Sequence, residues 1–281
     1  MHHMNLDERI KKDLTELFEK KEISEAKELS EKTGLEVSCF GLPQHFVGDR
    51  KAKTVFVQLN PGQDVALADK SFRCLTLDYD RTSPETFIES YKDSKRRYGE
   101  IDDYRRDSFD EKQASFLKHF TDSGVEIPEC FPKERTKEIC LEAKKNVLMQ
   151  KCQLELIPYC SANFNVNKKN LAALMPYVET LVDEIFSVER KYVIFGSAIF
   201  ADLFLNLNNT SFAVDVGEIR KFEIKGMKKK CSAQLMQITK DNRTIIAVIA
   251  RTFAGHSIGC AYEKMAEYGK QCYELLMKKK Y

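Results

Sequence analysis

The sequence predicts an α/β protein, a three-layer α/β/α sandwich with a mainly parallel central sheet. The segments at residues 53–59, 152–159 and 192–197 are each predicted to be a strand that ends at a turn with Pro or Gly, and the first holds the apolar run Val55 to Val57. Segments whose apolar residues recur at helical spacing separate these strands. Strands that alternate with helices are typical of a parallel sheet covered by helices on both faces.

The N-terminal part of the chain is predicted to be helical. Apolar residues recur at helical spacing through residues 5–32, and Gly34 suits the end of the last helix. We interpret residues 1–34 as an N-terminal helical extension and residues 35–281 as the α/β domain. Residues 35–52 are predicted to be a loop, because they are rich in turn residues.

An insertion is predicted after the first strand, at about residues 63–135. This stretch holds many charges and scattered aromatic residues but few aliphatic runs. Helical patches are expected near 84–98 and 109–122, and a further helix at 134–150. The stretch has no clear core of its own, so we interpret it as an insertion or lid. A role in binding a protein partner is an alternative that the sequence does not test.

The C-terminal half continues the alternation of strands and helices. Asp241 and Asn242 form a hairpin signal, since both residue types accept positive φ. Helices are predicted at 169–188, 198–205 and 260–277, and strands at 221–225, 232–239 and 244–250.

Composition narrows the classes of function. The formal net charge of +2 argues against a protein that binds polyanions over its whole surface, so a nucleic-acid contact would need a local basic patch. The nine cysteines form no C-x-x-C pair, and the sequence has no secretory signal and no apolar run of about 18 residues. We therefore expect reduced thiols, a cytoplasmic location, no membrane partner, and no metal or other cofactor. Distant cysteines that converge would still make a zinc or iron–sulfur site, but their spacing gives this no support.

Polar residues stand at three predicted strand ends. Asn60 follows the first strand, Glu155 lies in the second just before its closing Pro, and His256 follows the last. In open α/β sheets, ligands bind beyond the carboxyl ends of the strands. If these strands are neighbours, the three side chains converge in one cleft.

Together these motifs resemble the uracil-DNA glycosylase superfamily. Its first motif, G-x-N-P-G, is present as Gln58-Leu59-Asn60-Pro61-Gly62, with Gln for the leading Gly. Its second motif, H-P-S or a variant, is present as His256-Ser257-Ile258, without the Pro. Segments 46–49 and 155–161 are further similar to a bacterial branch of glycosylase-like proteins of undefined activity.

The resemblance implies roles for these residues. Asn60 would orient a water toward the anomeric carbon of a flipped nucleotide, and His256 would stabilise charge on the departing base. Ile258 would wedge between bases. The positions expected to contact the substrate are Gln58, Pro61, Gly62, Gln63, Tyr159, Ser257 and Ile258.

Glu155 departs from the family pattern. Uracil-cleaving members place there an Asn whose amide reads the base edge. An ionised carboxylate accepts hydrogen bonds but donates none, so Glu155 would read a donor-bearing edge or act as a general base. Its structural alternative is a buried ion pair. For Asn60 the alternative is capping of the turn, for His256 a structural histidine, and for Tyr159 a place in the core.

Two functions follow from these expectations. The first is a DNA-repair hydrolase that cleaves the N-glycosidic bond of a damaged or modified base, with DNA or a nucleotide as partner. The second is a non-catalytic nucleic-acid or nucleotide-binding module that retains the glycosylase fold. Asn60 and His256 at strand ends favour the enzyme, whereas Glu155 and the near-neutral charge favour the binding module.

Overall fold

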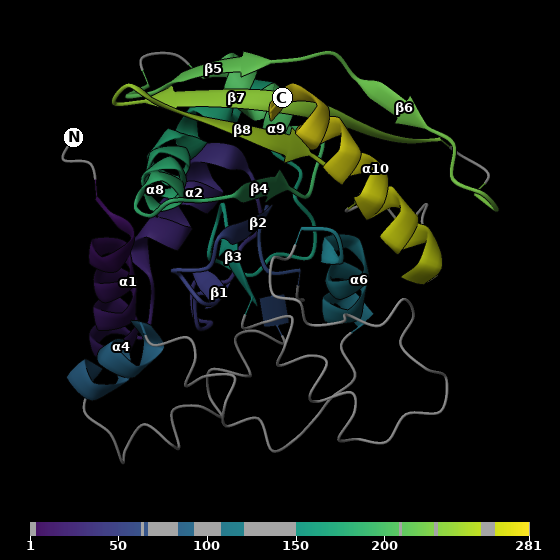
Figure 1. Cartoon of the computed structure of the whole chain (residues 1–281). Helices are drawn as coiled ribbons and strands as arrows, with labels where there is room; N and C mark the ends of the chain where they lie inside the picture. Colours follow the sequence, from purple (N-terminus) through teal and green to yellow (C-terminus); the bar gives the residue numbers. More distant parts are fainter. Residues whose placement is uncertain are drawn as a thin grey trace.

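The fold is mixed α/β, with helices packed on a central sheet (Figure 1). The computed structural model describes residues 4–62, 65–66, 84–92, 108–120, 150–207, 210–227, 230–253 and 262–280. The helix predicted at 134–150 lies outside this part of the chain, apart from its last residue. The predicted site residues that lie outside the described part are Gln63, His256, Ser257 and Ile258.

The described strands form one mixed sheet in the order β1-β3-β2-β4-β8-β7-β5, and β6 pairs with β7. The adjacent strands β3, β2, β4 and β8 are parallel, while β1 is antiparallel to β3 and β7 is antiparallel to β8, β5 and β6. The parallel part is therefore the centre of a mixed sheet. The strands are β1 Phe46–Gly48, β2 Thr54–Gln58, β3 Lys151–Glu155, β4 Tyr192–Phe195, β5 Ala213–Val216, β6 Arg220–Phe222, β7 Cys231–Lys240 and β8 Arg243–Ile249.

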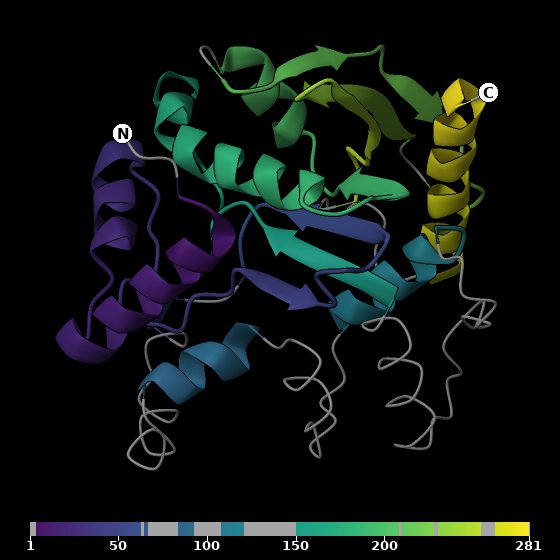
Figure 2. The same cartoon turned by 60° about the vertical axis from the view of Figure 1, so that its left-hand side comes forward.

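Helices cover the two faces of the sheet in two groups (Figures 1 and 2). The first group consists of α1, α2, α4, η1, α8 and α9 and shares one buried apolar cluster with the sheet. The second consists of α6 and α10 and shares the other cluster. The helices are α1 Leu6–Lys20, α2 Ser24–Thr33, α4 Pro84–Lys92, α6 Ser108–Leu117, the 3-10 helix η1 Lys168–Leu174, α8 Met175–Phe186, α9 Ile199–Asn206 and α10 Tyr262–Lys280.

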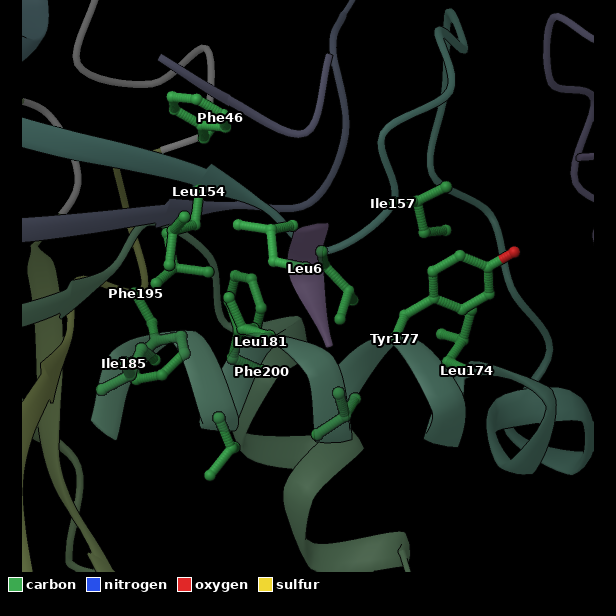
Figure 3. Packing of buried hydrophobic residues seen from close by; sticks show 14 of the residues in the cluster. Leu6, Phe46, Leu154, Ile157, Leu174, Tyr177, Leu181, Ile185, Phe195 and Phe200 are labelled. Carbon is green, nitrogen blue, oxygen red and sulfur yellow. The ribbon is translucent and has the colours of Figure 1, made fainter. Parts of the chain in front are cut away.

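The alternation of side chains along each strand separates these two cores. Val55 and Val57 of β2 belong to the first core, and Phe56 between them belongs to the second. In the first core, Phe195 of β4 packs on Phe200 of α9, with ring centroids 4.9 Å apart (Figure 3). Strands buried on both faces need apolar residues at successive positions, which explains the unbroken apolar runs in the sequence.

The N-terminal helices form as the sequence predicts, but they contribute directly to the first core. Asn5 caps α1 through a capping box with Glu8, and Gly34 ends α2 with φ of 72°. The apolar side of α1, from Leu6 to Leu17, is buried in the same cluster as the sheet, and Figure 3 shows Leu6 beside α8. Residue 34 therefore does not mark a boundary of this core.

Two edge strands were not predicted. The segment predicted as a loop at 35–52 contains β1, which pairs with β3, and β5 pairs with β7. Strands of three or four residues carry too little periodic signal, and pairing with a long neighbour creates them. The predicted helix at 169–188 begins as the 3-10 helix η1. The predicted hairpin is confirmed, since Asp241 and Asn242 have φ of 49° and 60° between β7 and β8.

Close packing of α10 on α6 yields a first prediction. A Cβ atom at Gly269 would lie 2.0 Å from the carbonyl oxygen of Phe116. Replacing an exposed helical Gly by Ala usually stabilises by about 1 kcal/mol. We expect Gly269→Ala instead to destabilise the protein by about 2 kcal/mol, because the backbone of α6 must move. Urea unfolding measures the change, with Gly62→Ala as control, where a Cβ would meet nothing within 4 Å. A neutral or stabilising Gly269→Ala would contradict this packing.

Candidate functional site

The carboxyl ends of β2 and β3 lie side by side and form the base of the candidate site. Gln58, the last residue of β2, is the register partner of Glu155, the last residue of β3. Backbone pairing continues past the strands: Leu156 N–H donates to the Gln58 carbonyl at 2.8 Å, and Ser161 N–H to the Pro61 carbonyl at 3.1 Å. The two loops that follow these strands are therefore held together.

Strand order places a topological switch point at β2. The chain leaves β2 for β3 on one side and returns from β3 to β4 on the other side. The first connection contains α4, which packs in the first core, and α6, which packs in the second, whereas η1 and α8 of the second connection both pack in the first core. Ligands of open α/β sheets bind where consecutive connections diverge in this way, beyond the carboxyl ends of the strands.

Asn60 ties the two loops together with its side chain. Its Nδ2 donates to the carbonyl oxygens of Pro61 and Ser161, at 3.0 Å each. These bonds use both amide hydrogens and fix the orientation of the carboxamide. Among the described residues no donor to Asn60 Oδ1 is recorded, so this oxygen is the atom with which Asn60 would accept a hydrogen bond from water. These two bonds match the structural alternative for Asn60, a side chain that caps the turn. They also hold the acceptor Oδ1 in one fixed orientation.

Gln58 carries a buried donor without a partner. Its side chain is on the second-core face with Phe56, since side chains alternate along β2. The residue is 7% exposed, and its Nε2 has no hydrogen-bond partner among the residues that the structure describes. A Cβ atom at Gly196, just after β4, would lie 2.6 Å from this nitrogen. The missing side chain at Gly196 therefore makes room for the Gln58 amide.

Glu155 carries the matching buried oxygen without a partner. Its Oε1 accepts from Gln153 Nε2 at 2.5 Å and from Gln44 Nε2 at 3.4 Å, whereas Oε2 is buried and has no partner in the described part of the chain. Burial raises the pKa of Glu155 to about 8, and the two amides and the Lys151 cation oppose this rise. At neutral pH the carboxyl group is therefore mostly protonated.

Protonation changes what Glu155 can do. The sequence interpretation assumed an ionised acceptor, but a neutral carboxyl group also donates one hydrogen bond. A protonated Glu155, like the Asn amide of the uracil-cleaving family members, can both donate and accept a hydrogen bond. It therefore differs less from that amide than the sequence indicates. No buried ion pair holds Glu155: the contacts recorded in the described part of the chain are to neutral amides. Gln58 Nε2 and Glu155 Oε2 are thus two unpartnered polar atoms on register partners of adjacent strands.

The remaining predicted site residues fall into two groups. Pro61 is half-buried and Gly62 is exposed, both in the loop after β2. Gln63, His256, Ser257 and Ile258 lie outside the described residues, so their place in the cleft stays a prediction. The end of β8 does reach this edge, because the Ala250 N–H donates to the Phe195 carbonyl of β4 at 2.8 Å.

Tyr159 lies in the core. It is 1% exposed, its hydroxyl donates to Asp13 Oδ2 at 3.0 Å, and its ring packs edge-on against Tyr177. A side chain enclosed in this way has no free ring face for a base. The core alternative for Tyr159 therefore fits the structure, and the stacking role does not.

Sequence reasoning overlooked Gln44, Gln153 and Gly196. Lys151, Gln153 and Glu155 alternate with apolar residues in β3, and this pattern was readable as a polar row on one face of the strand. Gln44 carried no local signal, because its contact with Glu155 spans 111 residues of sequence.

Hollows also lie among the described residues. A cavity of about 20 Å³ has room for a single water, and Arg9, His45, Glu155 and Tyr177 are among the residues that line it. A groove of about 690 Å³ lies among α1, α2, η1 and α8, on the first-core side. Neither Gln58 nor Glu155 lines this groove.

Further tests of function gave limited information. Comparisons with protein-family models, with curated proteins and with solved structures gave no match. In the described ranges, no group of three or more His, Cys, Asp or Glu is arranged to hold a metal ion. No helix in those ranges has the length and apolar character needed to cross a membrane.

The raised pKa of Glu155 predicts a specific pH dependence of stability. Between pH about 4.5 and about 8 the unfolded chain has lost the Glu155 proton while the folded protein keeps it. The unfolded state then binds fewer protons, so this group lowers the free energy of unfolding by about 1.4 kcal/mol per pH unit across that window. Below the window both states are protonated, and above it both are ionised.

Glu155→Gln removes this contribution. The difference in free energy of unfolding between the variant and the unmodified protein should therefore increase in favour of the variant as pH rises through the window. Urea unfolding of both proteins, inside the window and on each side of it, measures this trend. A difference that stays constant with pH would show that Glu155 titrates normally.

Proposed function

We propose that this protein binds a nucleobase at the carboxyl ends of β2 and β3 and hydrolyses its N-glycosidic bond, in the manner of the DNA glycosylases that its motifs resemble. One observation carries the proposal: Gln58 Nε2 and Glu155 Oε2 are buried, unpartnered and adjacent in register. An unpartnered buried polar group costs about 1–3 kcal/mol. Two of them at a switch point favour a bound ligand that supplies both partners.

The geometry suggests which residues read the base. Gln58 Nε2 would donate to an acceptor on the base edge. Glu155 Oε2 would donate when protonated and accept when ionised, so the preferred base edge depends on pH. A carboxyl group that is mostly protonated at neutral pH is suited to a hydrogen bond with the base edge. It is less suited to taking a proton from water, which requires the ionised form. The orientation of water would then fall to Asn60 Oδ1, and stabilisation of the departing base to His256.

A second candidate is a base-binding module without catalysis. The bonds of Asn60 to Pro61 and Ser161 favour it, because they explain this residue without any reaction. The two candidates share the reading role of Gln58 and Glu155. They differ in the role of Asn60, which contributes to turnover in the hydrolase and only holds the two loops together in the binding module.

The test measures binding and cleavage on the same substrates. Single- and double-stranded oligonucleotides bearing uracil, hypoxanthine, xanthine or an alkylated base are incubated with the unmodified protein and with Asn60→Ala. For a hydrolase, Asn60→Ala should lower kcat by about 100-fold while Kd changes little, because water positioning acts in the transition state. Thermal melts report any loss of stability from the two lost hydrogen bonds. Binding without cleavage by the unmodified protein would support the module, and neither binding nor cleavage would reject the site.

The contact between Gly196 and Gln58 allows a sharper test of the reading role. Gly196→Ala should displace the Gln58 amide, which ends a flexible side chain, at little cost in stability. We expect binding of the preferred oligonucleotide to weaken about tenfold, which corresponds to one lost hydrogen bond. Gly217→Ala is the control, since its Cβ would make only ordinary contact, 3.5 Å from the Leu235 carbonyl. Unchanged affinity in Gly196→Ala would remove Gln58 from the site.

A further inference from the structure

A row of buried polar residues runs along one face of β3 toward the candidate site. Lys151, Gln153 and Glu155 occupy alternate positions, and all three are buried. Gln113 of α6 lies over the row and is also buried. Three consecutive polar side chains on the inner face of a central strand are unusual, because each must find partners away from water.

The Lys151 ammonium group determines the direction of the hydrogen bonds in this row. It donates to Gln113 Oε1 and, at 3.2 Å, to Gln153 Oε1. An ammonium group has only donors, so both carboxamides must turn their oxygens toward it. Gln113 then presents its Nε2, which donates to Gln153 Oε1 at 2.8 Å.

The orientation of Gln153 follows from these contacts. With two donors on its Oε1, its Nε2 must face the other way, and it donates to Glu155 Oε1 at 2.5 Å. Reversing the amide would place its hydrogens against the donors of Lys151 and Gln113. Gln44 donates to the same Glu155 oxygen at 3.4 Å, so Oε2 is the oxygen left without a partner.

We propose that Lys151, Gln113 and Gln153 form a directional amide relay, in which Gln113 and Gln153 are positioning residues that hold the Glu155 carboxyl group with Oε2 free for the ligand. The relay starts at the amino end of β3 and reaches the site through a helix of the insertion between β2 and β3. The relay depends on the proposed function in one respect, the assignment of Glu155 to the ligand site. The relay itself is testable without any ligand.

The relay also affects the proton affinity of Glu155. The Gln153 hydrogen bond and the Lys151 charge both favour the ionised form, against the larger effect of burial. In the described part of the chain, Lys151 is the charged group that acts on this carboxyl group, and Gln153 and Gln44 are its hydrogen-bond donors. Removing the relay should therefore raise the pKa of Glu155 further. If the Gln153 and Lys151 contacts did not act on the Glu155 carboxyl group, their loss would lower stability and leave this pKa unchanged.

Titration of the Glu155 carboxyl carbon by NMR tests the relay. The protein is labelled with ¹³C in its glutamate carboxyl groups, and Glu155→Gln identifies the Glu155 signal. We expect Gln153→Met and Lys151→Met each to raise the Glu155 pKa by about one unit or more. Thr54→Val is the matched control, because it removes a buried hydrogen bond to the Phe120 carbonyl on the same face but leaves the relay intact.

The outcomes separate the relay from a structural role. An unchanged Glu155 pKa in folded Gln153→Met and Lys151→Met would overturn the relay, as would an equal shift in Thr54→Val. If Lys151→Met does not fold, the double variant Lys151→Met with Gln113→Met takes its place, since it also removes Gln113 Oε1, which Lys151→Met alone leaves without its donor. Because the titration uses no ligand, failure of base binding would reject the proposed function and leave the relay standing.

Discussion

The parallel pairing of β2 with β3 on one side and β4 on the other is the constraint on which the candidate site depends. It sets Gln58 opposite Glu155, and it brings the unsubstituted backbone of Gly196 next to the Gln58 amide. Side chains alternate strictly along a strand, so a slip of one residue would turn Gln58 or Glu155 into the opposite core. Apolar residues at every other position of both strands prevent such a slip.

The two faces of β3 differ in the side chains that they present. The first-core face of β2 and β3 is apolar, with Val55, Val57, Cys152 and Leu154 packed under helices that include α1 and α8. The second-core face of β3 is polar, and it is covered by α6, which comes from the insertion between β2 and β3. In β3, apolar packing and specific polar contacts are thus on opposite faces. The insertion takes part in the site through Gln113, and Lys112 Nζ also donates to the Phe253 carbonyl beyond β8 at 2.6 Å.

The burial of Glu155 at the candidate site has a cost in stability. Desolvation favours the neutral carboxyl group, while amide donors and the Lys151 cation favour the ionised one. The balance places the titration near physiological pH, where each form is accessible. A well-packed apolar residue at this position would avoid the cost, and it would also remove the only carboxyl group seen at this strand end among the described residues. The orphaned Oε2 is consistent with a group held ready for a partner.

Local features of this protein follow from the sequence by itself. The three central strands, the end of α2 at Gly34 and the hairpin at Asp241 and Asn242 were predictable, because periodicity and turn chemistry act over a few residues. The same patterns placed Asn60 and Glu155 at the ends of strands, and the structure shows that these two strands are neighbours.

Other features required the tertiary structure. The edge strands β1 and β5 exist through pairing with distant partners, and the sheet is mixed because of such edge and hairpin strands. The tie from Asn60 to Ser161 spans 101 residues, and the bond between Gln113 and Gln153 spans 40. The protonation of Glu155 depends on the burial that these contacts create. No local pattern encodes such quantities, since hydrogen-bond partners and desolvation are set by whichever residues the fold brings together in space.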